Sequence, residues 1–161
     1  MRRIGLISDT HDLLRPEAKA ALAGCEHIIH AGDITVAQVI DELATLAPVT
    51  AVRGNNDRDA WALDLAEVEM LHFDQVSLYV IHDLAQLDEL PPSAPVRVII
   101  SGHSHKPSIR ETDGVLHVNP GSAGRRRFTL PVTVGELLID GDQVSARIIE
   151  LAVAPPKRKK S

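Results

Sequence analysis

The chain has 161 residues, a formal net charge of −5 and a single cysteine, Cys25. A chain of this length folds as about one domain and can bury roughly 70% of the surface that its unfolded form exposes. The net negative charge argues against a nucleic-acid-binding surface. A single cysteine excludes a disulfide framework and a metal site built from thiolates. No apolar run approaches the length that spans a bilayer. We therefore expect a cytoplasmic protein with no membrane contact.

Strands and helices are expected to alternate in the first half of the chain. The expected strands are 2–8, 27–30 and 49–53. The expected helices are 15–22 and 36–46. Pro16 suits the first turn of the first helix, and apolar residues recur at helical spacing in the second. Residues 57–66 fit either a short helix or a loop.

Hairpins are expected to dominate the second half. The expected pairs of strands lie within 67–81, 108–119 and 131–151, with a lone strand at 96–101 and a short helix at 84–90. Asp113-Gly114 is a strong turn signal for the middle hairpin. The whole pattern predicts an α/β (α+β) fold of four layers, in which two mixed β-sheets pack face to face with helices on the outside, as one domain over 1–153. Residues 154–161 are expected to form a disordered basic tail.

Five apolar runs end in residues that can bind a metal ion. The residues that follow them are Asp9, His11, Asp33, Asn55, His82, His103 and His105. Residues two apart in an extended segment point to the same side, so His103 and His105 are expected to aim at one place. Because ligands sit outside the carboxyl ends of the strands in open α/β sheets, we expect all seven donors at one edge.

Each of these residues also has an ordinary structural interpretation. Asp9 or Asp33 could cap a helix, residues 54–57 could form only a turn, and His82 could be a partly buried strand histidine. Five strand ends converging by accident are improbable, so the set as a whole predicts a metal site. Aspartate, asparagine and histidine without cysteine suit Mn, Fe, Co, Ni or Zn better than an all-oxygen cage for Mg or Ca. Seven ligands fit two ions that share a carboxylate, a centre suited to displacement at phosphorus.

Several motifs, in this order and at these strand ends, resemble those of the calcineurin-like metallophosphoesterases. They are Asp9-Thr10-His11, Gly32-Asp33, Gly54-Asn55, His82 and Gly102-His103-Ser104-His105. The short length and the turn at 119–122 are similar to the small YfcE-like phosphodiesterase branch of bacteria and archaea. The resemblance covers about 4–151 and implies a β-sandwich flanked by helices.

The resemblance also implies a role for each candidate ligand. Asp9, His11 and His105 would hold one divalent ion, and Asn55, His82 and His103 would hold the other. Asp33 would bridge the two. The implied cofactor is a pair of ions, with Mn expected and Ni, Fe, Co or Zn compatible. The implied function is a binuclear-metal-dependent phosphoesterase, most often a phosphodiesterase, in which a metal-bridging hydroxide attacks phosphorus in line. The substrate would be a small-molecule phosphoester.

Two positions depart from the pattern of the family. Asn56 stands where larger members have a histidine, and His103 is the other residue that we expect to act in catalysis. The Asn56 amide can hydrogen-bond a phosphate oxygen but cannot donate a proton at neutral pH. We therefore expect it to bind substrate, with slow turnover and a preference for good leaving groups. Asp83, where many relatives have glycine, adds a negative charge near an anionic substrate.

A different class of function remains open. The same branch resembles the retromer subunit that uses this fold as a metal-holding scaffold for partner proteins. Nucleic-acid processing is opposed by the acidic charge and by the lack of an aromatic platform, whereas a homo-oligomer is compatible with the hairpin edges. His30 is expected in the core or as a donor to a ligand carboxylate. The arginines at 125–127 are either solvated or steer phosphate.

Overall fold

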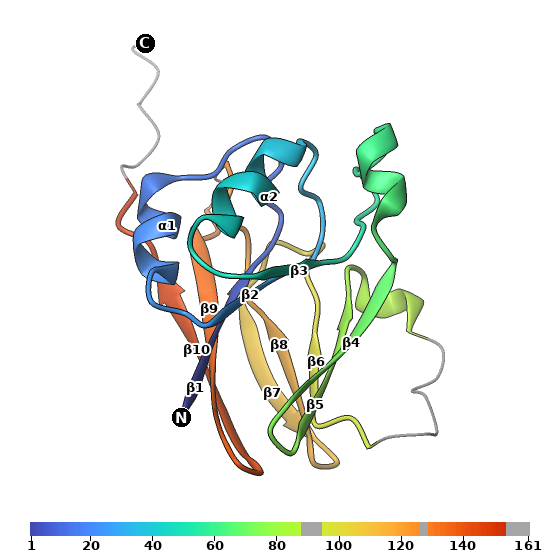
Figure 1. Ribbon diagram of the computed structural model, residues 1–161, viewed down its shortest axis with the longest axis vertical. Coiled ribbons are helices and arrows are strands. Elements are labelled where there is room, and N and C mark those ends of the chain that lie inside the picture. Colours follow the sequence, from blue (N-terminus) through green and yellow to red (C-terminus); the bar gives the residue numbers. More distant parts are fainter. Residues whose placement is uncertain (88–94, 126–128, 154–161) are drawn as a thin grey trace.

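The computed structural model describes residues 1–87, 95–125 and 129–153, and two five-stranded sheets pack face to face in it (Figure 1). The first sheet has the order β10-β9-β1-β2-β3. Its strands are β1 Arg2–Ile7, β2 His27–His30, β3 Val49–Ala51, β9 Thr133–Asp140 and β10 Gln143–Glu150. β1, β2 and β3 run parallel, and β9 and β10 form the expected hairpin beside β1.

The second sheet has the order β4-β5-β6-β8-β7. Its strands are β4 Val68–Phe73, β5 Val76–Ile81, β6 Val98–Ile100, β7 Ser108–Thr112 and β8 Val115–Asn119. β5, β6 and β8 are parallel, and the edge strands β4 and β7 return as antiparallel partners of β5 and β8. The two hairpins predicted over 67–81 and 108–119 are therefore confirmed.

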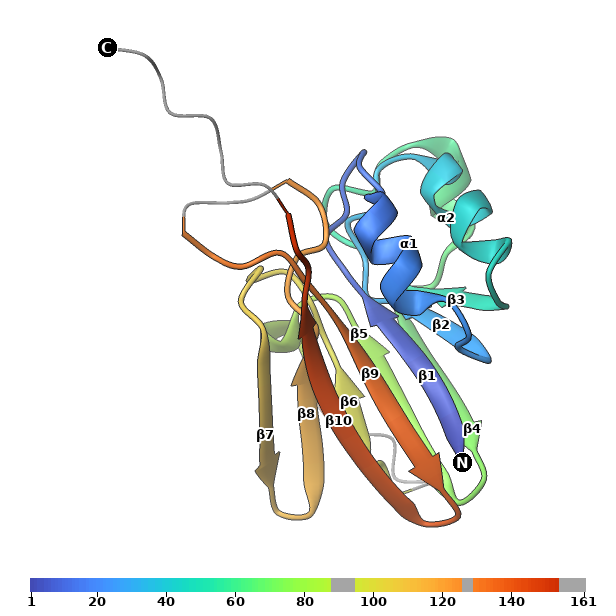
Figure 2. The same ribbon diagram turned by 90° about the vertical axis from the view of Figure 1, so that its left-hand side faces the viewer.

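Both α-helices of the described residues cover the outer face of the first sheet (Figure 2). They are α1 Pro16–Leu22 and α2 Ala37–Ala44. Each buries one apolar stripe, through Ala18 and Leu22 in α1 and through Val39 and Leu43 in α2. The spacing of these pairs by four residues places them on one side of each helix. No helix among the described residues is long and apolar enough to cross a membrane.

Two short 3₁₀ helices complete the fold, at Ala60–Asp64 and Leu84–Gln86. The helix predicted over 84–90 is thus a single turn within the described residues, started by the Asp83 carboxylate, which accepts the Ala85 N–H. Residues 88–94 lie outside the described part, as do Arg126, Arg127 and the basic tail at 154–161. The predicted sandwich of two mixed sheets is confirmed, and where the structure is described its α-helical layer lies on one side only.

Two apolar clusters hold the layers together. The cluster between the sheets draws on alternate residues of the strands, such as Ile4 and Leu6 of β1 against Leu78 and Val80 of β5, all 0% exposed. The cluster under the helices includes Cys25, which packs as the small core residue that the sequence predicts. Because alternate side chains of a strand point to opposite faces, β1 and β2 contribute to both clusters. This packing fixes the direction of the strands and hence the edge at which they end.

Candidate metal centre

The seven predicted donors come together at the edge where the parallel strands of both sheets end. Each donor stands on the loop that follows one of five strands: β1, β2, β3, β5 or β6. Three come from the second sheet, His82 after β5 and His103 and His105 after β6. The other four come from the first sheet. The face-to-face packing of the sheets therefore builds the site from two halves, and neither sheet holds the full set.

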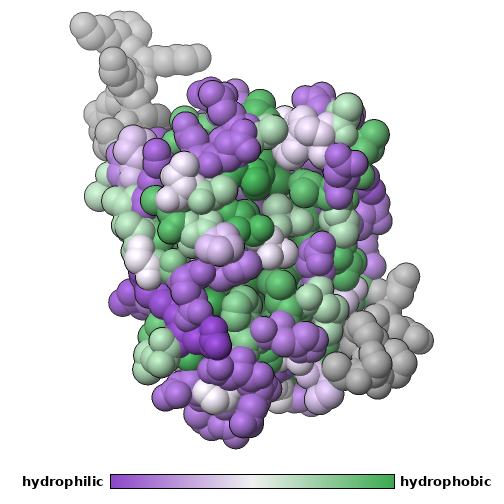
Figure 3. Space-filling view, in the orientation of Figure 1, coloured by the Kyte–Doolittle hydropathy of each residue, from purple (hydrophilic) through white to green (hydrophobic). Residues whose placement is uncertain are grey.

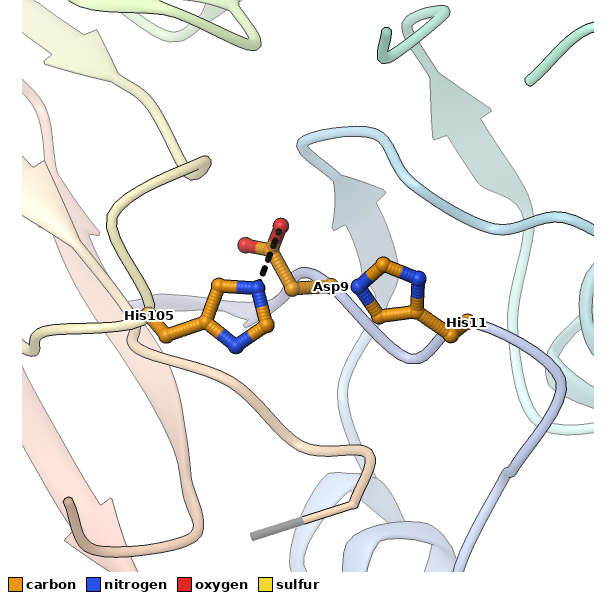
Figure 4. A group of neighbouring side chains, drawn as sticks. All are labelled: Asp9, His11 and His105. Carbon is orange, nitrogen blue, oxygen red and sulfur yellow. Dashed lines mark ion pairs between the residues drawn. The ribbon is translucent and has the colours of Figure 1, made fainter. Parts of the chain in front are cut away.

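The first group of donors consists of Asp9, His11 and His105 (Figure 4). One ligand atom from each lies within 4.8 Å of the others, and His105 Nε2 is 3.5 Å from Asp9 Oδ1. Asp9 is 0% exposed and His105 is 4% exposed. The two imidazole rings stand 5.5 Å apart on either side of the carboxylate. Such a shielded set of one carboxylate and two imidazoles is a typical ligand set for a first-row divalent ion.

The second group consists of Asp33, His82 and His103, whose ligand atoms also lie within 4.8 Å of one another. The Asn55 side chain joins this group, because its Oδ1 is 3.0 Å from His82 Nε2 and 3.2 Å from His103 Nδ1. His82 Nδ1 donates to the Ala31 carbonyl at 2.7 Å, which leaves the lone pair of Nε2 facing the group. That tautomer is the one in which Nε2 can bind a metal ion.

The carboxylate of each group also lies near a histidine of the other group. Asp33 Oδ2 is 3.3 Å from His82 Nε2 in the second group and 4.0 Å from His11 Nε2 in the first. On the other side, Asp9 Oδ1 lies 4.0 Å from His82 Nε2. The two groups are therefore neighbours, and Asp33 and Asp9 both lie at the boundary between them. This is the position that a bridging ligand would need.

Two buried ligand atoms have no hydrogen-bond partner among the described residues, Asp9 Oδ1 and His11 Nε2. Buried polar atoms are nearly always paired, so two unpaired atoms in one place indicate that a bound group normally contacts them. Burial raises the pKa of Asp9 to about 6. Burial would also raise the pKa of Asp33, but without metal a protonated His82 and the Asn56 N–H donate to its carboxylate and hold that pKa far below its usual value. A pair of divalent cations fits this donor set, because it would neutralise both carboxylates and use both unpaired atoms.

The backbone at the site is strained. Asp9, His11, Asp33, His103 and His105 have φ between 51 and 71°, in the left-handed region that residues other than glycine rarely enter. Each such residue costs about 1 kcal/mol or more. The expectation that residues two apart would share a direction is wrong here for the same reason. These loops are not extended, and His103 and His105 belong to different groups of donors.

Asp57 ties two of the ligand loops together. Its Oδ1 accepts the N–H groups of Ile34 and Thr35, and its Oδ2 accepts those of Asp33 and Gly54, at 2.7 to 2.9 Å. The loops are so close that a Cβ on Gly54 would overlap the Asp33 backbone nitrogen and carboxylate. Sequence reasoning missed Asp57 as a functional residue, because the segment that begins there has no clear periodicity. The signal that was available is its place two residues after Asn55.

The loop that carries His103 and His105 is positioned in a similar way. Asn119, at the end of β8, donates to the Gly102 carbonyl and to Ser104 Oγ. The His103 N–H donates to Asp9 Oδ2, so the loop also binds the first sheet. A Cβ on Gly102 would overlap the Ser8 hydroxyl and come within 2.8 Å of Asp9 Oδ2. Only glycine allows this close approach of the two sheets at the site.

Asn56 and Asp83 lie next to the second group of donors. Asn56 donates to both oxygens of Asp33, from its backbone N–H at 2.9 Å and from Nδ2 at 3.0 Å. Asp83 Oδ2 is 3.9 Å from His103 Nε2. Asn56 therefore supports the carboxylate that stands between the groups, in addition to the contact with substrate that the sequence predicts. Arg125, the described member of the arginine cluster, pairs with Asp12 at 3.6 Å on the exposed surface.

His30 lies in the core, which is one of its two predicted roles, and it does not donate to a ligand carboxylate. It is 0% exposed, its Nδ1 accepts the Gly32 N–H, and its Nε2 lies 3.0 Å from Thr10 Oγ1. Because Nδ1 is an acceptor, Nε2 carries the hydrogen and donates to Thr10. His30 thus fixes the loop between Asp9 and His11 without touching either carboxylate.

We expect the His30→Gln variant to weaken the pH dependence of stability. Burial lowers the pKa of His30 to about 3, whereas an unfolded histidine has a pKa of about 6.5. As the pH falls from 6.5 towards 3, the unfolded chain takes up this proton first, and the folded state loses about 1.4 kcal/mol per pH unit. Urea denaturation of metal-free protein at several pH values gives the free energy of unfolding as a function of pH. Between pH 6.5 and 3 this free energy should change with pH by about 1.4 kcal/mol per unit less in the variant than in wild type. His72→Gln, at an exposed site on β4, is the control, and an equal slope in His30→Gln and wild type would contradict the expectation.

The fold and the two neighbouring groups of donors resemble those of metal-dependent phosphoester hydrolases. A family model for the calcineurin-like phosphoesterase superfamily domain matches residues 1–142, and the chain belongs to that family. A probable metallophosphoesterase of Methanothermobacter thermautotrophicus is 39% identical over 158 residues, with 91% of each chain covered. A phosphodiesterase of Methanocaldococcus jannaschii is 33% identical, with 92% of this chain and 99% of the relative covered.

The same fold occurs in proteins of another kind. The crystal structure of Vps29 from Chaetomium thermophilum matches with a TM-score of 0.74 and 18% identity, over 93% of this chain and 96% of the other. At that identity the likeness concerns the fold alone. The predicted family is confirmed by the family model and by the sequence relatives.

Proposed function

We propose that the chain is a binuclear-metal-dependent phosphodiesterase. The observation that carries the proposal is the pair of neighbouring donor groups with the Asp33 carboxylate between them. Asp9, His11 and His105 would hold one ion, Asn55, His82 and His103 the other, and Asp33 both. The phosphodiesterase relative, at 33% identity, supports diesters as the substrates.

The residues of the chain would have distinct tasks in this reaction. When bound, the two ions would activate a water for in-line attack and neutralise charge on the phosphoryl oxygens. Asn56 would hydrogen-bond a phosphoryl oxygen through its amide while its backbone N–H holds Asp33. His103 has 46% of its side chain exposed, so it is open to substrate as well as to the metal centre. The Asn56 amide cannot donate a proton to a leaving group at neutral pH, which supports the preference for good leaving groups.

We expect Mn²⁺ to restore hydrolysis of bis(p-nitrophenyl) phosphate in protein stripped with a chelator, and His103→Ala to lower kcat/KM by about 100-fold or more. The measurement is release of p-nitrophenolate, together with the metal content of each variant. His72→Ala is the matched control, because His72 is an exposed histidine of β4 bonded to Ser77. Activity that survives in His103→Ala would count against the proposed site.

A scaffold that holds metal ions without catalysis is the second candidate function. It is favoured by the likeness to Vps29 in fold and by the surface. Hydrophobic side chains gather across the middle of the face on which α2, β3 and β4 lie (Figure 3). Partly buried residues of these elements include Ile40, Val49 and Phe73. Stoichiometric metal binding without hydrolysis of phosphomonoesters, phosphodiesters or cyclic nucleotides would favour this function over the first.

A further inference from the structure

Two clefts of about 370 Å³ each open beside the metal centre. The first is lined by Asn55 and His82 of the second donor group, and the second is lined by His103 of the same group. Asp83 lines both clefts and stands at the boundary between them. A phosphodiester has two organic groups on its phosphorus, and each cleft offers space for one of them.

The first cleft carries no unbalanced positive charge. Its one cation, Arg53, is 2.8 Å from the Glu67 carboxylate. Asp83 adds a second negative charge, and Tyr79 and Ile81 give the wall an apolar part. A further anionic group would meet two carboxylates and one arginine that is already paired. This cleft therefore suits an uncharged part of a substrate.

The second cleft has more positive than negative charge, because two cations and a single carboxylate, that of Asp83, line it. Lys106, on the loop after β6, and Arg110, on β7, both line it. Within the described part of the chain, neither side chain lies within 4.0 Å of a carboxylate, although the protein as a whole is acidic. Arg110 stands opposite His117 of β8 in the strand register, which brings the two side chains to the same face. Burial and the Arg110 charge lower the pKa of His117, which favours the neutral form of its ring.

Hydroxyl groups complete the second cleft. Ser101, Ser104 and Ser108 line it together with the two cations. Two cations, several hydroxyls and a neutral imidazole form a typical environment for a phosphate, which accepts many hydrogen bonds and carries negative charge. Because His103 lines this cleft and also belongs to the metal centre, a group bound in the cleft can be part of the molecule whose phosphorus lies at the metal centre.

We propose that the second cleft binds a second phosphate of the substrate, so that the substrate class is a small phosphodiester with a further phosphate on one of its organic groups. This inference rests on the proposed phosphodiesterase function and extends it to specificity. Lys106 and Arg110 supply the charge that distinguishes such a substrate from a simple diester. The first cleft takes the uncharged group.

The test uses a matched pair of substrates with the metal-loaded full chain. Thymidine 5′-(p-nitrophenyl phosphate) carries one phosphate, and its 3′-phosphorylated form carries two. We expect kcat/KM of wild type to be about tenfold higher for the doubly phosphorylated substrate, as expected for one charge-assisted contact. Arg110→Gln and Lys106→Gln should each lower this ratio, and the double variant should bring it close to one. Arg97→Gln is the control, because Arg97 lies outside both clefts and pairs with Glu111.

Calorimetry gives a readout that does not depend on turnover. Thymidine 3′,5′-bisphosphate should bind wild type about tenfold more tightly than thymidine 5′-phosphate, and Arg110→Gln should lose that difference. The inference would be overturned if wild type showed equal kcat/KM for the two esters and equal Kd for the two nucleotides. It would also be overturned if Arg110→Gln and Lys106→Gln left the preference for the doubly phosphorylated molecule intact. If neither ester is hydrolysed while the calorimetric preference persists, the phosphodiesterase function fails and the anion-binding cleft stands.

Discussion

Replacing Asp33 by asparagine is expected to lower phosphodiesterase activity by about 1000-fold or more and to reduce the bound metal below two ions per chain. The substitution preserves the size of the side chain and removes only its charge and one acceptor oxygen. Asp33 Oδ2 lies near histidines of both donor groups, 3.3 Å from His82 and 4.0 Å from His11. An amide nitrogen at that place cannot accept, and a neutral side chain cannot offset two dications.

The expectation for Asp33 is stronger than for any single histidine. Loss of one histidine removes a ligand from one group, whereas loss of this carboxylate weakens both groups together. Asn56 would aggravate the change, because its N–H groups now donate to the two Asp33 oxygens and one of them would face an amide nitrogen. The Asp33→Asn variant therefore loses both functions of Asp33, as a metal ligand and as the hydrogen-bond acceptor for Asn56.

Metal content by mass spectrometry and hydrolysis of bis(p-nitrophenyl) phosphate are the two measurements for this variant. Asp41→Asn is the matched control, since Asp41 is exposed on α2 and the same charge is removed far from the site. Two tightly bound ions and wild-type turnover in Asp33→Asn would show that the carboxylate does not bridge. Two bound ions with lost turnover would place its role in catalysis and not in metal binding.

The Asp57→Asn variant is expected to lose about 3 kcal/mol of the free energy of unfolding, even without metal. Asp57 is 3% exposed, and its carboxylate accepts four backbone N–H groups from two loops. An asparagine keeps one acceptor oxygen and turns its NH₂ group towards two N–H donors. Those donors are buried and would be left without a partner, and each costs about 1–3 kcal/mol when unsatisfied.

Urea denaturation in the presence of a chelator measures this effect apart from metal binding. Asp59→Asn, two residues along at an exposed position, should change the free energy of unfolding by less than about 0.5 kcal/mol. A loss for Asp57→Asn that is as small as that of the control would show that the loops hold without the carboxylate. A second consequence is weaker metal binding, because Asp33 and Asn55 stand on the two loops that Asp57 joins.

Most of the fold and the identity of the candidate ligands could be predicted from local signals. Strand periodicity located the strands, turn residues such as Asp113-Gly114 located the hairpins, and the residue types at the strand ends suggested a metal centre. Contacts between distant segments decided the alternatives that the sequence left open. His30 lies in the core, and its two ring nitrogens bond to Thr10 and Gly32 and not to a ligand carboxylate. The only local signal for Asp57 was its place two residues after Asn55, because three of its four partners lie on the loop after β2.

The sequence by itself determined the order of strands and helices, the core-facing residues of each strand, and the kinds of donor atom at the strand ends. These depend on short-range periodicity and on side-chain chemistry, which neighbouring residues set. The resemblance to a family implied how the donors divide into two groups, whereas the tertiary structure alone decided how close the donors lie to one another and which side chains line the two clefts. Those features depend on two sheets that meet at one edge and on loops forced into left-handed conformations. Such geometry arises only when distant segments pack together, because no local interaction favours it.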